Sequence, residues 1–280
     1  IASKVCSFIS RMCFDNICFF FIRNNTKMKR SFAATQTWEA PTPMLGDEYK
    51  FTRDNLKGAR EYLQEHGFVA ILGVTDVKEL RKQFFTDLEF LGTGFKREDP
   101  TTYNHRYLPG TTIIDDPDAG IGQSKTMWDA CESVQHIMKN MYNVPDDTRM
   151  IRSFDVATIF PNRFHPDVKT NLHTLSNWLH SDQNPRIPQH DFYQNVLLLT
   201  KSTPQTGGFV CVPRTHTRHV ELLPNFRGNS NHCRFDLSES IVETSLNGKI
   251  QMPMVPAGTL IIWDSRLAHA SHPALVKPTA

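Results

Sequence analysis

The sequence predicts a mainly β domain, a barrel or sandwich with helices packed on one face. The first half of the chain contains amphipathic helical patterns, and from Arg152 onward short apolar runs alternate with turn residues. Helices followed by a dense run of strands are typical of a sheet-based fold with helical support. With 280 residues, 39% of them hydrophobic, the chain can form one large core.

The first predicted helix begins after Thr52, a residue type that caps helix N-termini, and ends at Gly67, which supplies a left-handed C-cap. The apolar run Phe68–Leu72 follows and predicts a short buried strand. A second helix is expected from Thr75 or Asp76 to Gly92, with apolar residues three and four positions apart.

The third predicted helix carries the apolar positions Trp128 to Met141 and is closed by the breaker Asn143–Pro145. Before it, the stretch Lys96–Ser124 is rich in Pro, Gly, Asp and Thr and predicts surface loops. The expected strands are Val156–Phe160, Phe192–Thr200, Phe209–Pro213, Ile250–Val255 and Thr259–Asp264. Pro256–Gly258 joins the last two strands, and the pattern predicts a hairpin there.

The N-terminal part is interpreted as a leader. Residues 1–49 are expected to be disordered or not translated, with translation starting at Met28, and a single domain is expected over residues 50–280. The apolar patch Ile17–Ile22 is far shorter than the roughly 20 residues that cross a bilayer, so no membrane span is expected.

Charge and cysteine content exclude several classes of protein. The chain has 31 Lys and Arg against 29 Asp and Glu, a net charge of +2, which argues against an electrostatic nucleic-acid binder. Outside the leader, Cys131, Cys211 and Cys233 stand far apart without a CxxC pair. Reduced thiols in an intracellular, cytoplasmic protein are therefore expected, and no protein partner is indicated.

Two His-x-Asp triplets are candidate metal ligands. Residues i and i+2 of a strand point to the same face, so the imidazole and the carboxylate can reach one metal. His180/Asp182 is the stronger pair, because the triplet of His165 and Asp167 contains a central proline and adjoins turn residues. A surface loop histidine is the alternative for His180.

His269 is the best distal partner, since it follows the apolar strand Thr259–Asp264. Two histidines and one carboxylate form the facial triad of non-haem Fe(II) oxygenases, which leaves positions open for a cosubstrate and O₂.

Several blocks in order then resemble the phytanoyl-CoA dioxygenase family of Fe(II)/2-oxoglutarate oxygenases. They are Asn177–Gln183, Gly207–His216 and Gly258–His269, preceded by Glu65–Leu72 and Arg152–Asp155. The resemblance extends from about Asn55 to Ser271 and implies a double-stranded β-helix, a jelly-roll or cupin-like barrel, with helices packed against its larger sheet. It also implies that Fe(II) is bound by His180, Asp182 and His269.

The resemblance implies further roles near the metal. Ser271 matches a position that helps to hold the 2-oxoglutarate carboxylate, and Gln183 and His216 are expected to face the substrate. For His216, a hydrogen-bonded loop histidine is the favoured alternative.

One departure concerns the anchoring of 2-oxoglutarate. The family has an arginine shortly after the distal histidine, whereas Ala270–Ala280 contains only Lys277 as a cation. Either the chain is truncated before that arginine, which is the favoured interpretation, or the cosubstrate site is altered. Arg266 is a candidate substitute anchor, although an ion pair with Asp264 is favoured because residues i and i−3 of a strand point to opposite faces.

The expected function is that of an Fe(II)- and 2-oxoglutarate-dependent dioxygenase. It would use O₂ to hydroxylate a small or lipid-like organic substrate, with formation of succinate and CO₂. One alternative is a non-catalytic or regulatory metal-binding barrel that has lost 2-oxoglutarate anchoring. Another is a cupin-like isomerase or lyase that does not need 2-oxoglutarate.

Overall fold

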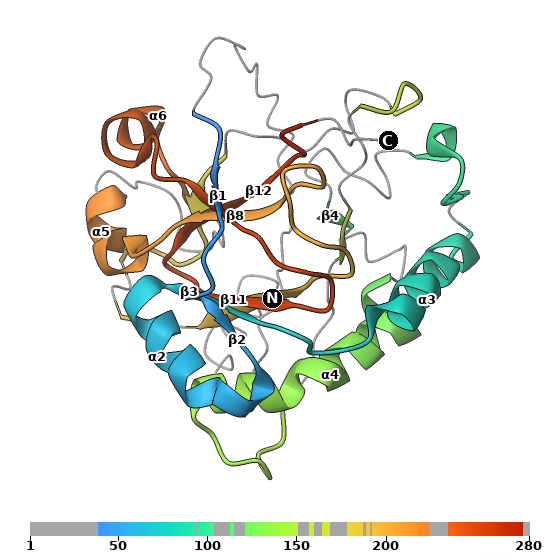
Figure 1. The fold of residues 1–280 in the computed structure, drawn as a ribbon, viewed down its shortest axis with the longest axis horizontal. Helices are drawn as coiled ribbons and strands as arrows, with labels where there is room; N and C mark the ends of the chain where they lie inside the picture. Colours follow the sequence, from blue (N-terminus) through green and yellow to red (C-terminus); the bar gives the residue numbers. More distant parts are fainter. Residues whose placement is uncertain are drawn as a thin grey trace, which may run out of the picture.

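The structure of the chain is a computed structural model. It describes residues 39–92, 94–103, 113–114, 121–150, 157–159, 164–168, 178–186, 189–190, 192–223 and 235–276. Residues 1–38, the block Arg152–Asp155, Cys233 and Lys277 lie outside this part. Figure 1 shows the described strands in the middle of the molecule, with helices along two of its sides.

Two sheets contain most of the described strands. The six-stranded sheet has the order β1 (Thr42–Met44), β10 (Gln251–Pro253), β8 (Gly208–Val212), β12 (Ala268–His272), β6 (His180–Ser181) and β9 (Phe235–Asp236). The four-stranded sheet has the order β2 (Lys50–Phe51), β3 (Phe68–Ile71), β11 (Leu260–Asp264) and β7 (Tyr193–Leu197). β4 (Ile113–Ile114) and β5 (Ala157–Thr158) form a separate antiparallel pair.

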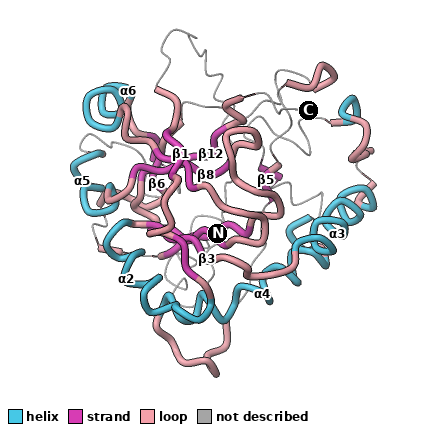
Figure 2. The backbone as a smooth tube through the Cα atoms, viewed as in Figure 1, coloured by secondary structure: helices cyan, strands magenta, loops and turns pink. Residues whose placement is uncertain are grey.

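The longer helices α2 (Leu56–His66), α3 (Val77–Phe90) and α4 (Lys125–Tyr142) follow one another along one side of the molecule (Figure 2). The short helices α5 (His219–Leu222) and α6 (Glu239–Ile241) lie on the left of the same view. A π-helical segment, Val242–Leu246, continues α6. Single 3₁₀ turns cover Arg53–Asn55, Pro100–Thr102, Ile121–Gln123 and Thr215–Arg218.

Three apolar clusters fill the interfaces between these sheets and helices. The first packs α2 and α4 against Leu260 and Ile262 of β11. The second lies between the two sheets and contains Ile261 and Trp263 of β11 with Phe209 of β8. The third packs the outer face of the six-stranded sheet against the segments around α5 and α6. Alternate residues of β11 thus face opposite sides, because the side-chain period of a strand is two.

This arrangement confirms the predicted mainly β fold with supporting helices, two facing sheets of the double-stranded β-helix type. Apart from the pair of β4 and β5, the described strands form two separate sheets and no closed barrel. Among the described strands, α2 and α4 pack on the four-stranded sheet, where the outer face of β11 is apolar.

The predicted hairpin at Pro256–Gly258 was also wrong. β10 belongs to the six-stranded sheet and β11 to the four-stranded sheet, so the turn carries the chain from one sheet to the other. The backbone of Gly258 is bonded to the loop before α3 instead, since its carbonyl accepts from the N–H of Val74 at 2.8 Å.

Two boundaries near the N-terminal side also differ from expectation. The expected leader, residues 1–49, reaches too far, because β1 pairs in parallel with β10 and Tyr49 is fully buried. Asn55, not Thr52, caps α2, with its side chain accepting from the N–H of Gly58. The left-handed cap at Gly67 is confirmed, with φ of 84°.

Two further expectations concern helices and thiols. Among the described residues, none of the helices combines the length and the hydropathy needed to cross a membrane. Cys131 and Cys211 are buried free cysteines.

A substitution at Gly207 tests how closely the backbone at the end of β12 approaches this glycine. An alanine there would adopt φ of 73°, and its Cβ would lie 2.4 Å from the backbone oxygen of His272. Gly73 has a similar φ of 63° with no atom within 4 Å of such a Cβ. Gly73→Ala should therefore cost only the left-handed strain of about 1 kcal/mol, and Gly207→Ala about 1–3 kcal/mol more. Urea unfolding measures both, and equal losses would contradict the close backbone approach.

Candidate metal centre

His180, Asp182 and His269 meet at one point. His180 and His269 are directly opposed on the antiparallel strands β6 and β12, and Asp182 follows β6 by one residue. One potential ligand atom from each residue lies within 4.8 Å of the others, and all three side chains are buried. The predicted triplet and the predicted distal histidine are thus brought together.

Backbone carbonyls fix both imidazoles. Nδ1 of His180 donates to the carbonyl of Trp178 at 3.0 Å, and Nδ1 of His269 donates to that of Leu267 at 2.9 Å. In a neutral imidazole the other nitrogen, Nε2, then carries the lone pair. These two Nε2 atoms lie 3.6 Å and 2.9 Å from the carboxylate oxygens of Asp182. Such bonds orient metal-binding histidines.

This donor set fits a metal cation. Neither carboxylate oxygen of Asp182 accepts a hydrogen bond, although both are buried. Two lone pairs from the imidazoles therefore face a buried carboxyl group that accepts no hydrogen bond. A cation between them would supply the missing favourable interaction. Two imidazoles with one carboxylate suit Fe(II).

Aromatic rings surround the three side chains. The indole of Trp178 stacks on His180 with ring centroids 4.9 Å apart, and its Nε1 donates to the carbonyl of Ser271 at 2.8 Å. On the other side, Trp263 and Phe209 contact the ring of His269 at 5.1 Å and 5.8 Å. These rings keep water away from the ligands and limit their rotation.

The turn between β11 and β12 holds Asp182 in place. The carbonyl of Ser265 accepts from the N–H of Asp182 at 2.9 Å and from Oγ of Ser181 at 3.3 Å. The Ser265 N–H donates to the carbonyl of Phe192 at 3.1 Å, and its Oγ donates to Oε1 of Gln183 at 2.7 Å. One residue of the turn thus joins the segment that carries Asp182 to the start of β7.

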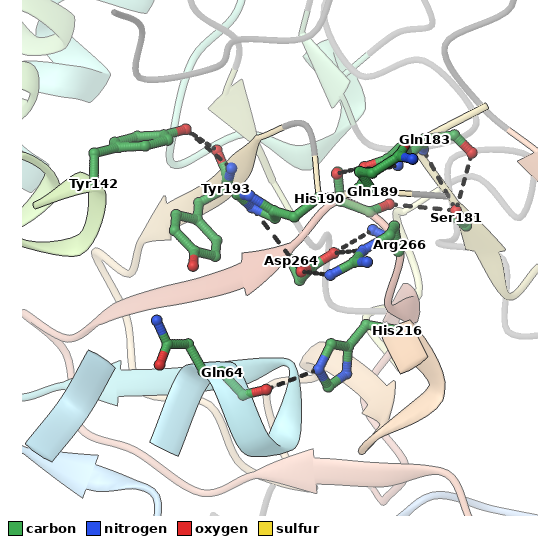
Figure 3. Close-up of polar contacts among 11 residues, drawn as sticks. Gln64, Tyr142, Ser181, Gln183, Gln189, His190, Tyr193, His216, Asp264 and Arg266 are labelled. Carbon is green, nitrogen blue, oxygen red and sulfur yellow. Dashed lines mark hydrogen bonds and ion pairs between the residues drawn. The ribbon is translucent and has the colours of Figure 1, made fainter. Parts of the chain in front are cut away.

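Gln183 was expected to face the substrate, but its side chain takes part in this polar network. Besides accepting from Ser265, its Nε2 donates to the carbonyl of Gln189 at 2.6 Å (Figure 3). Its backbone carbonyl accepts from Nε2 of His219 at 2.9 Å. The side chain therefore braces the loop after β6.

His216 lies against the C-terminal end of α2. Its Nε2 donates to the carbonyl of Gln64 at 3.1 Å (Figure 3), and its Nδ1 is buried without a partner. Burial lowers the pKa of His216, and the bond to Gln64 only partly opposes this effect. The placement matches the alternative of a hydrogen-bonded loop histidine.

Arg266 forms the expected ion pair with Asp264. Nε and Nη2 of Arg266 donate to the two carboxylate oxygens at 2.9 Å and 2.7 Å (Figure 3), and Nε2 of His190 lies 3.9 Å from Oδ2. Burial disfavours the charged carboxylate, but the bonds and charge of Arg266 outweigh it, so the pKa of Asp264 is lowered. Arg266 lies in the turn before β12, not on the strand of His269 as the sequence suggested.

The other two sequence candidates have contrasting surroundings. Ser271 lies two residues after His269 on β12 and so shares its face. His165 and Asp167 are 3.9 Å apart at an exposed turn, far less enclosed than the His180 triplet.

Sequence reasoning missed the roles of Trp178 and Ser265. Both lie in runs that resemble the family, Trp178 close to His180 and Ser265 close to His269. Their contacts join residues more than 80 positions apart, so a local pattern gives no signal for them.

Ser265→Ala tests the hydroxyl of Ser265, which binds Gln183 beside Asp182; the backbone bond from the N–H of Asp182 to the carbonyl of Ser265 is kept. Removing the hydroxyl leaves the buried Oε1 of Gln183 without its donor, which should cost about 1–3 kcal/mol in unfolding free energy. We also expect Co(II) affinity to fall about tenfold, as for other groups that support ligands. Ser202→Ala is the matched control, because Oγ of Ser202 is buried without a partner and its loss should change neither quantity. Urea unfolding and Co(II) absorption titration measure the two effects, and unchanged values in both would contradict a supporting role for this hydroxyl.

Comparisons with known proteins complete the description. A search of curated proteins gives no significant match. Among solved structures, AviO1 from Streptomyces viridochromogenes Tue57 is 16% identical over 80% of this chain and 90% of its own, with a TM-score of 0.45. EvdO2 from Micromonospora carbonacea var. aurantiaca, solved with 2-oxoglutarate, is 16% identical over 78% of this chain and 84% of its own, with a TM-score of 0.49.

The family comparison covers most of the chain. The model of the family described as phytanoyl-CoA dioxygenase matches residues 63–275, a range that contains all three candidate ligands. The chain therefore belongs to the phytanoyl-CoA dioxygenase family, a family of iron- and 2-oxoglutarate-dependent enzymes.

Proposed function

We propose that the protein is a dioxygenase that hydroxylates a small or lipid-like organic substrate, with formation of succinate and CO₂ from 2-oxoglutarate. The observation that carries the proposal is the buried group of His180, Asp182 and His269, whose ligand atoms converge while neither oxygen of the carboxyl group accepts a hydrogen bond. Family membership supports the same assignment.

Three protein ligands would hold the iron. They are Nε2 of His180, Nε2 of His269 and the carboxylate of Asp182, a set that leaves positions open on the metal. When bound, iron supplies the activation of O₂ and the oxidative decarboxylation of 2-oxoglutarate, chemistry that side chains alone do not provide.

The remaining residues position and enclose the reactants. The carbonyls of Trp178 and Leu267 keep both imidazoles in one tautomer. Ser271 shares the face of His269 and can donate a hydrogen bond to a carboxylate of 2-oxoglutarate. Phe209 and Trp263 pack against the ring of His269 and give the metal centre apolar surroundings, which supports an organic substrate.

Replacing a ligand tests this function. His180→Ala and Asp182→Ala should abolish succinate formation from 2-oxoglutarate in the presence of Fe(II) and O₂, because either change removes a metal ligand. His165→Ala is the matched control, since its imidazole belongs to the other His-x-Asp triplet and is 41% exposed. Turnover that persists in either ligand variant would rule out the assignment.

An anaerobic titration separates the alternatives. Adding Fe(II) and then 2-oxoglutarate to the full chain should produce the weak visible charge-transfer band of bidentate chelation, and His180→Ala should lose it. Metal binding without this band would instead indicate a metal-binding barrel that does not take the cosubstrate. Metal-dependent turnover without succinate would indicate an isomerase or lyase.

A further inference from the structure

The segment Thr215–His219 contacts both parts of the chain that carry the candidate metal ligands. It consists of the 3₁₀ turn Thr215–Arg218 and the first residue of α5, and it follows strand β8. The polar residues at its two ends, Thr215 and His219, are each only 3% exposed. Buried polar side chains need hydrogen-bond partners, and both of these find them in the backbone of other segments.

Thr215 fixes the start of β12. Its Oγ1 accepts from the N–H of Ala268 at 2.9 Å and donates to the carbonyl of Val212 at 2.7 Å. Ala268 and Val212 are cross-strand partners at the end of the antiparallel ladder of β12 and β8. The hydroxyl of Thr215 therefore closes this ladder one residue before His269.

His219 fixes the segment that follows Asp182. Its Nε2 donates to the carbonyl of Gln183 at 2.9 Å. Burial lowers the pKa of His219, so the ring is neutral and Nε2 carries its one proton. Since the N–H of Asp182 is bound by the carbonyl of Ser265, the backbone is held both at Asp182 and at the next residue.

These two bonds connect the two ligand segments through a third one. Asp182 follows β6 and His269 lies on β12, and their ligand atoms are 2.9 Å apart. Thr215 and His219 are separated by little more than one helical turn, a short and regular piece of backbone. The neighbours of both ligands are therefore fixed relative to each other by one segment.

We propose that Thr215 and His219 are positioning residues of the metal centre, which set the separation of Asp182 and His269 by binding the backbone beside each of them. They act through Gln183 and Ala268 and are not ligands themselves. This inference rests on the proposed function and deepens it.

His216 is a matched control within the same segment. It is also buried, its Nε2 also donates to a backbone carbonyl, and its Nδ1, like that of His219, has no partner. Burial lowers the pKa of both imidazoles. The difference lies in the bonded carbonyl, because His216 binds Gln64 of α2 (Figure 3), a helix that carries none of the three ligands.

The test is the Co(II) affinity of the full chain, measured by visible absorption titration. In His219→Leu this affinity should fall about tenfold, as for other residues that orient ligands. His219→Gln keeps an N–H donor at the end of the side chain and should restore the affinity. His216→Leu should keep the affinity of the unchanged chain. It should lower the urea midpoint of the metal-free chain about as much as His219→Leu, because each change leaves one carbonyl without its donor.

Thr215→Val provides a second, nearly isosteric variant, which does not depend on the folding of His219→Leu. It removes the hydroxyl bound to Ala268 and should also lower the Co(II) affinity about tenfold. Thr215→Ser keeps a hydroxyl and should preserve the affinity. Thr217→Val is the matched control, because the hydroxyl of Thr217 is exposed and donates to the carbonyl of Arg214 within the same turn.

Three results would overturn the positioning role. They are an unchanged Co(II) affinity in His219→Leu or in Thr215→Val, an equal loss of affinity in His216→Leu, and no recovery in His219→Gln. All three leave the proposed function intact, because the unchanged chain still binds Co(II). If the unchanged chain does not bind Co(II), the metal centre of the proposed function fails, and the positioning role fails with it.

Discussion

The hydrogen bond from the backbone N–H of Asp182 to the carbonyl of Ser265 is the contact on which the metal centre depends. Strand β6 ends at Ser181, so Asp182 has no strand partner to fix its position. Ser265 supplies one, and its own N–H and Oγ are bound to Phe192 and Gln183. Because the same turn leads into β12, it places the carboxylate and His269 relative to each other.

The ligands could be predicted from sequence because their geometry depends on short-range rules. His180 and Asp182 are two residues apart on an extended segment, and this spacing puts them on one face in any register. The opposition of His180 and His269 is different, since it depends on the pairing of β12 with both β6 and β8. His269 was chosen because it follows the apolar strand Thr259–Asp264, and the family resemblance implied the same residue, but neither gave the register that places it opposite His180.

The errors have a common physical cause. Short apolar strands joined by a turn can pair with each other or enter two facing sheets, and the alternation of side chains is the same in both cases. At Pro256–Gly258 the two strands enter different sheets, and the prediction of a hairpin was therefore wrong. Gln183 shows the same limit, because its partners Ser265 and Gln189 could not be deduced from its position beside Asp182. The ion pair of Asp264 and Arg266 was predictable because both partners are local.

Unpartnered buried groups are not equivalent in this molecule. His216 and His219 each satisfy Nε2 and leave one neutral nitrogen alone, a modest penalty. Asp182 leaves both oxygens of a carboxyl group unsatisfied beside two imidazole lone pairs, which is far less favourable. A cation at this point removes that penalty in the folded chain and cannot do so when the ligands are dispersed in the unfolded chain. Metal binding and the stability of the facing sheets are therefore linked through Asp182.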